Sequence, residues 1–120
     1  MISHSLQRLF ATEQIGDITI VRFPSLCELA GEIVPRLGEQ LFDLIDHGKH
    51  TQLLMNLHNV SGIDSAMIGK VVGLHRRALA AGGRLALCQI PAELNEILQT
   101  VKLGSVMGFY RDEEEALRTF

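Results

Sequence analysis

Short apolar segments alternate with longer stretches of helical periodicity, and this alternation most constrains the fold of the chain. Apolar strands are predicted over 51–57, 84–88 and 106–110, with helical patterns between them. Strands that alternate with helices are typical of parallel crossovers, in which helices pack against a sheet. A length of 120 residues fits one domain. We therefore expect a single α/β domain over 1–120 with a mixed sheet.

A hairpin precedes the first crossover. Its strands are predicted over 9–13 and 18–23, with a turn at Gly16-Asp17. The second strand is apolar on both faces, so we expect layers on both sides of it. Together with the later elements, this hairpin gives the predicted order ββαβαβαβα.

Four helices are expected. The first covers about 30–47, the second follows Asp64-Ser65 and stops at Gly82-Gly83, the third begins near Pro91, and the last begins at Asp112. The second helix is predicted to bury the stripe Ile68, Val71, Val72, His75, Ala78 and Leu79, and 58–62 is predicted to be a loop. The expected core comprises Ile20, Leu37, Leu41, Leu54, Ile68, Val72, Leu85, Leu87 and Leu94.

Charge and composition argue against several classes of protein. Eleven basic and fourteen acidic side chains give a net charge of −3, whereas binding to nucleic-acid phosphates needs a basic patch. No apolar run approaches the roughly 18 residues of a membrane span, and residues 1–8 do not resemble a signal peptide. Cys27 and Cys88 are far apart and lack a zinc-site spacing. We expect a reduced, cytoplasmic protein without a membrane span and without direct nucleic-acid binding.

Cofactor and catalytic motifs are weak. The glycines form neither a dinucleotide fingerprint nor a phosphate loop, and the histidines form no set of three or four metal ligands. We therefore expect no cofactor and no metal. His58 lies near Asp64 and Ser65 in the sequence, which leaves open a small serine hydrolase that uses Ser65 and His58. Ser65 does not lie on a Gly-x-Ser-x-Gly turn, so this alternative has little support.

The pair Asp64-Ser65 before the second helix has two interpretations. Either side chain can cap the helix by accepting a hydrogen bond from a free amide of the first turn. Alternatively, Ser65 is a phosphorylation site at the surface, where a phosphate would add about −1.5 to −2 charge beside Asp64. Such a modification would change partner binding without changing the fold.

Small residues mark one face of the same helix. Ser65, Gly69, Gly73 and Arg76 recur at near-helical steps. Each glycine costs about 1 kcal/mol relative to alanine in an exposed helix interior, so a reason for both is expected. One reason is close packing against the protein's own sheet, and the other is a flat partner-binding surface beside Ser65.

Across these segments the sequence resembles the STAS domains of the anti-sigma factor antagonist family. The likeness covers 53–65, 76–88, 91–94 and 109–117, and the order and spacing of the segments make it specific. It implies a small STAS-like sandwich with a mixed β-sheet and about four helices packed mainly on one face.

The resemblance also implies a function. Members are non-enzymatic modules that bind an anti-sigma factor, which is a serine protein kinase, and thereby regulate transcription. The kinase phosphorylates the serine that matches Ser65, after the aspartate that matches Asp64, and a serine phosphatase reverses the modification. Ser65, Gly69, Gly73 and Arg76 are the expected partner-binding residues, and a homodimer or a larger STAS assembly is a further expectation.

The chain departs from the family pattern directly after Ser65. The family usually has a second Ser or Thr and then Gly, whereas this chain has Ala66 and Met67. We expect Met67 to place a bulky side chain where a partner would approach the backbone. Because some STAS proteins of stressosome scaffolds also lack the pair, a scaffold without a switchable serine is the alternative function.

Overall fold

The computed structural model describes residues 7–120. Residues 1–6, which belong to the segment examined for a signal peptide, lie outside this range. The elements are β1 (Ala11–Ile15), β2 (Ile18–Arg22), β3 (Cys27–Leu29), η2 (Gly31–Ile33), α1 (Val34–Asp46), β4 (Gln52–Asn56), β5 (Val60–Ile63), α2 (Ser65–Ala80), β6 (Arg84–Cys88), α3 (Ala92–Thr100), η3 (Leu103–Ser105), β7 (Gly108–Tyr110) and α4 (Glu113–Thr119), where η marks a 3-10 turn.

Five strands form a mixed sheet in the order β1-β2-β4-β6-β7. The β1–β2 hairpin is antiparallel, and the other three pairings are parallel. The predicted α/β class, the mixed sheet and the four helices are therefore confirmed within residues 7–120. The hairpin turn at Gly16-Asp17 is confirmed as well, although β1 begins two residues later than predicted.

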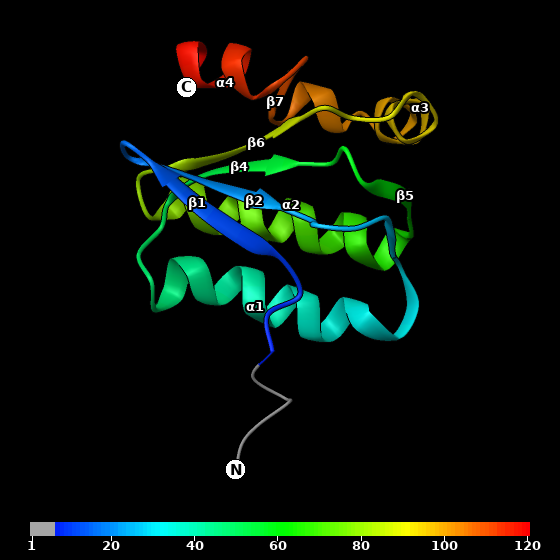
Figure 1. Ribbon diagram of the computed structural model, residues 1–120, viewed down its shortest axis with the longest axis horizontal. Coiled ribbons are helices and arrows are strands. Elements are labelled where there is room, and N and C mark those ends of the chain that lie inside the picture. Colours follow the sequence, from blue (N-terminus) through cyan, green and yellow to red (C-terminus); the bar gives the residue numbers. More distant parts are fainter. Residues whose placement is uncertain (1–6) are drawn as a thin grey trace.

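Two helices cover one face of the sheet and a third covers the other. Figure 1 shows α1 and α2 below the strands, with α4 above them. Val21, Leu53 and Leu85 belong to the larger core on the α1–α2 side, whereas Ile20 and Leu54 pack with Ala116 of α4. Adjacent residues of β2 thus enter different cores, which confirms that this strand is covered on both sides.

Half of the predicted buried stripe of α2 is confirmed, since Val71, His75 and Ala78 are buried, and the other half is wrong. Ile68 and Val72 are only half-buried and Leu79 is 55% exposed, whereas Met67 and Leu74 are fully buried. Two apolar stripes run along this helix, displaced by one residue or about 100° around its axis. Periodicity does not distinguish them, and the sheet packs on the stripe that starts at Met67. The other seven predicted core residues are buried.

The region predicted as a loop over 58–62 contains β5. This strand pairs in parallel with β3, which the sequence did not indicate, in a separate two-stranded sheet. Both strands are short, and Ser61 and Gly62 have little intrinsic preference for a strand. Their pairing depends on a contact between segments about 33 residues apart, which a local pattern cannot reveal.

His75 is buried on α2. Its Nδ1 accepts a hydrogen bond from the Leu85 backbone amide of β6 at 3.3 Å, and the residue is 6% exposed. Burial lowers the pKa of His75, and a hydrogen bond with the Val106 backbone offsets this only in part. The neutral imidazole therefore links α2 to the sheet.

Leu54 provides a test of the sheet core. Leu54→Ala should lower the free energy of unfolding by about 2–5 kcal/mol, because it removes a fully buried side chain between β4 and α4. Urea unfolding measures this change. Leu26→Ala is the control, since Leu26 is 76% exposed; equal losses for the two variants would contradict the layer assignment.

His75 should make stability pH-dependent. The unfolded chain protonates this imidazole near pH ~6.5, whereas the folded protein does so only at lower pH. Acidification through the unfolded pKa therefore favours unfolding, and the free energy of unfolding should fall below about pH 7. Urea unfolding between about pH 7.5 and 5 should show a shallower fall for His75→Gln. A His75→Gln variant with the wild-type slope would refute this assignment.

Candidate functional site

Asp64 joins the start of α2 to the segment that precedes α1. Its Oδ1 accepts a hydrogen bond from the Met67 amide at 2.9 Å, and its Oδ2 accepts one from the Gly31 amide at 2.9 Å. Its own amide donates to the Leu29 carbonyl at 3.3 Å. Asp64 is therefore the cap of α2, and it also fixes the chain entering α1.

Two features keep this carboxylate charged and in place. The hydrogen bonds from Gly31 and Met67 hold the pKa of Asp64 below its usual range. Gly31 has φ +74°, a left-handed conformation that glycine adopts without strain. The glycine thus allows the backbone to turn its amide toward the Asp64 carboxylate.

Ser65 is the first residue of α2 and is exposed. Within residues 7–120, its hydroxyl makes no hydrogen bond with the protein. The side chain sits at the helix N-terminus, where the partial positive charge favours an anion. A phosphate on Ser65 would project into solvent without displacing a structural contact.

The partner-binding face predicted for α2, made of Ser65, Gly69, Gly73 and Arg76, is present in part. Gly69 and Arg76 are exposed, and a methyl group on Gly69 would meet nothing within 4 Å, so the surface beside Ser65 is open. Gly73 is turned toward α1 instead, because a methyl group there would lie 3.4 Å from the Phe42 ring. Gly73 therefore faces α1 and not the sheet, and its packing would also accommodate a methyl group at ordinary contact distance.

The expectation for Met67 is wrong. Met67 is fully buried in the core between α2 and the sheet, so its side chain does not stand on the partner-facing surface. Ala66 is exposed beside Ser65. The departure from the family pattern therefore changes the surface only through the missing hydroxyl at Ala66.

The arrangement required for a serine hydrolase is not formed. His58 lines a cavity of about 340 Å³ together with Leu26, Val60 and residues 91–94, and Ser65 is not among the lining residues. No hydrogen bond joins His58 to Ser65 in the part of the chain that the structure describes. Groups of three or more potential metal ligands are likewise absent from residues 7–120. No helix in the same range could cross a membrane.

A polar network that the sequence did not indicate fixes α4. Nε and Nη2 of Arg22 donate to the two carboxylate oxygens of Glu113, at 2.8 and 2.7 Å. Asn56, which is 7% exposed, donates to Glu113 Oε2 at 2.6 Å. Arg22 lowers the pKa of Glu113, so the pair remains charged. Residues separated by 91 positions meet here, and no local pattern connects them.

Variants of Met67 and Ala66 test whether the first side chain belongs to the core and the second to the surface. Met67→Ala should lower the free energy of unfolding by about 2–5 kcal/mol, because it leaves a cavity in the core. Ala66→Ser, which restores the usual hydroxyl, should change it by no more than about 0.5 kcal/mol. Urea unfolding compares the two variants, and a neutral Met67→Ala would show that this side chain is not buried.

Comparison with known proteins gives the family. Residues 10–116 match the STAS domain family. The anti-sigma F factor antagonist of Paenibacillus polymyxa is 23% identical over 96 residues, which cover 77% of this chain and 82% of that protein.

Two solved structures show the same fold. The anti-sigma factor antagonist SpoIIAA in its unphosphorylated form is 27% identical, with a TM-score of 0.75, over 90% of this chain and 92% of its own. The Bacillus cell fate determinant SpoIIAA in its phosphorylated form is 26% identical, with a TM-score of 0.69, over 92% of this chain and 97% of its own. With the family match spanning nearly all of the described residues, the chain belongs to the STAS domain family.

Proposed function

We propose that this chain is an anti-sigma factor antagonist that regulates transcription in the cytoplasm by binding an anti-sigma factor with serine kinase activity. The observation that carries the proposal is Ser65, exposed on the first turn of α2 beside the capping Asp64. The similarity to anti-sigma factor antagonists over most of both chains supports the same role. Binding would occupy the anti-sigma factor and release its sigma factor.

Phosphorylation of Ser65 is the proposed switch. A kinase that modifies this hydroxyl must bring the γ-phosphate of a nucleotide to it, so the bound partner places phosphates against the start of α2. A phosphate on Ser65 would then face the remaining nucleotide charge and would disturb the contact near Gly69. The existence of SpoIIAA in unphosphorylated and phosphorylated forms supports such a cycle. A serine phosphatase would reset it.

A binding survey tests the function. Each anti-sigma factor kinase of the source organism is purified and titrated against this protein by calorimetry, with and without its sigma factor. We expect one kinase to bind and to release its sigma factor. Failure of every anti-sigma factor to bind would refute the proposal, whereas elution as a large assembly in size-exclusion chromatography would favour the scaffold function.

Ser65 variants test the switch. Ser65→Asp should weaken binding to the kinase by about 2 kcal/mol, or roughly thirtyfold. Ser65→Ala should bind like the wild type but resist loss of affinity when the kinase and ATP are added. Both should unfold like the wild type, because Asp64 and not Ser65 caps the helix. Unmodified Ser65 after incubation with the kinase, together with unchanged binding by Ser65→Asp, would favour a constitutive scaffold.

A further inference from the structure

Carboxylates outnumber basic side chains at the end of the molecule that carries Ser65, where Arg22, Arg36 and Lys70 lie just outside the segments concerned. Three segments meet there: 23–35 and 57–69 join through the β3–β5 pair and the Asp64–Gly31 hydrogen bond, and 89–98 contributes to the cavity that holds His58. These segments contain five carboxylates and no Lys or Arg, although the chain has eleven basic residues. The five are Glu28, Glu32, Asp64, Glu93 and Glu96.

An apolar groove lies within this acidic end. It has a volume of about 340 Å³ and is lined by Leu26, His58, Val60, Ser61, Pro91, Ala92, Glu93 and Leu94. Val60 and Leu94 are buried, whereas Leu26, on the loop before β3, is 76% exposed. Among the large hydrophobic side chains of residues 7–120, Leu26 is the most exposed, and its position beside Val60 and Leu94 extends the apolar surface of the groove.

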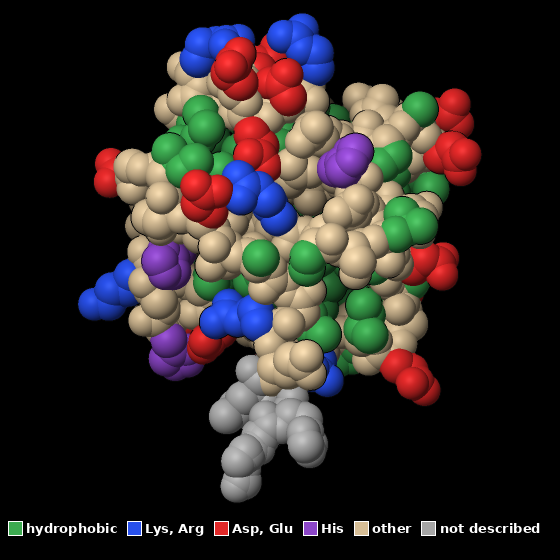
Figure 2. Space-filling view, in the orientation of Figure 1, with side chains coloured by type: hydrophobic (Ala, Val, Ile, Leu, Met, Phe, Trp, Pro, Cys, Tyr) green, Lys and Arg blue, Asp and Glu red, His purple; other side chains and the backbone are tan. Residues whose placement is uncertain are grey.

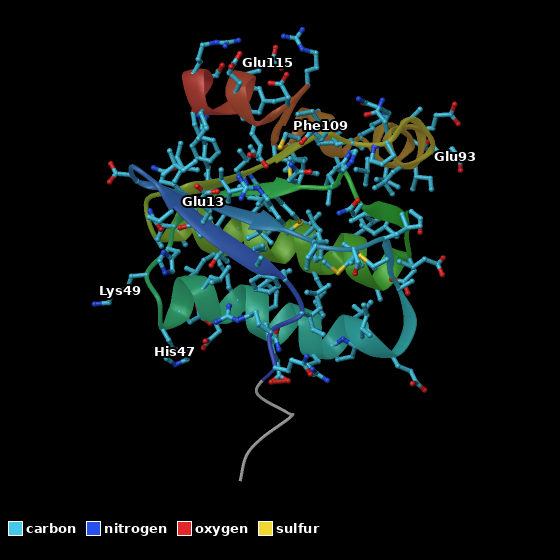
Figure 3. All side chains as sticks on the ribbon, in the orientation of Figure 1. Glu13, His47, Lys49, Glu93, Phe109 and Glu115 are labelled. Carbon is cyan, nitrogen blue, oxygen red and sulfur yellow. The ribbon has the colours of Figure 1, made fainter. Side chains whose placement is uncertain are left out.

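One acidic side chain lines the groove, and a second lies on the strand that follows Leu26. Glu93 belongs to its lining, and Figure 3 shows this residue on the outer side of α3. Glu28 lies over β5, because a methyl group on Gly62 would come within 3.2 Å of its Oε2. The nearby Arg22 cannot balance them, since it is paired with Glu13 and Glu113. On the right of Figure 2, hydrophobic and acidic side chains lie side by side, and no basic side chains are visible among them.

The groove is rigid and close to Ser65. The Cys27 amide donates to the Asn59 carbonyl at 2.9 Å, and Asn59 Nδ2 donates to the Phe23 carbonyl at 2.7 Å, so the wall that carries Leu26 is fixed to the wall segment around Val60. Strand β5 leads from Ser61 to Ser65 over about 13 Å, at roughly 3.3 Å per residue. A standard interface covers about 800 Å² on each partner, so one partner can contact both places.

We infer that the groove bordered by Glu28 and Glu93 is a second anchor for the anti-sigma factor, and that it receives an apolar side chain flanked by Lys or Arg. This inference rests on the proposed function and adds the chemistry of the partner segment. The apolar side chain packs against Leu26, Val60 and Leu94, and the basic residues meet the acidic border. Charge complementarity favours a basic segment, because Glu93 lines the groove and none of its lining residues within 7–120 is Lys or Arg.

The test uses the anti-sigma factor identified by the binding survey. Leu26→Ser should weaken binding about tenfold by removing an exposed apolar contact. The double variant Glu28→Lys with Glu93→Lys should weaken it at least about tenfold in about 0.05 M salt, and the loss should shrink in about 0.5 M salt because ions screen the border. Wild-type affinity should itself fall over this range.

Matched controls come from the opposite end of the molecule. Leu79→Ser changes another exposed apolar residue, near the end of α2, and Asp17→Lys reverses a charge at the β1–β2 turn. Both should bind like the wild type, and thermal unfolding verifies the fold of every variant. If the anti-sigma factor binds the groove variants and the wild type equally, the groove proposal fails and the proposed function stands. If no anti-sigma factor binds the wild type, both fail.

Discussion

The Asp64 carboxylate is the interaction on which the functional end of this protein depends. One of its oxygens caps α2 and the other holds the Gly31 amide before α1, so a single side chain sets the starts of both long helices. These helices cover one face of the sheet, and the start of α2 presents Ser65. Asp64, which precedes the proposed switch, thus has a structural role. The Ser65 hydroxyl has no part in capping α2.

Fold stability and the proposed switch therefore depend on different side chains, Asp64 for the first and Ser65 for the second. A helix N-terminus tolerates added negative charge, and Asp64 already satisfies the Met67 amide. A phosphate on Ser65 can therefore alter what binds at the surface without competing for the cap. The neighbouring Met67 side chain points into the core, so variation there affects packing and leaves the contact surface unchanged.

Sequence patterns predicted the structural features that depend on residues close together in the chain. The strand over 84–88, a cap of α2 at Asp64 or Ser65 and a helix beginning at Asp112 follow from periodicity and helix signals; all three are present, and the structure assigns the cap to Asp64. The choice between two apolar stripes on α2 depends on the sheet beneath it, and β3 depends on pairing with β5. Likewise, the groove collects residues from three distant segments, although the absence of basic residues from each was visible in the sequence.

The attachment of α4 has a consequence for how the chain acquires its fold during synthesis. The face of the sheet formed by Ile20, Leu54 and Ala86 is covered by the last helix, which Glu113 fastens to Arg22 near the start of the chain. Until α4 has been synthesised and has left the ribosome, the α1–α2 layer can assemble, but this second apolar face remains open. The nascent chain therefore passes through a one-sided sheet whose exposed apolar surface favours chaperone binding or aggregation, and docking of α4 completes the sandwich.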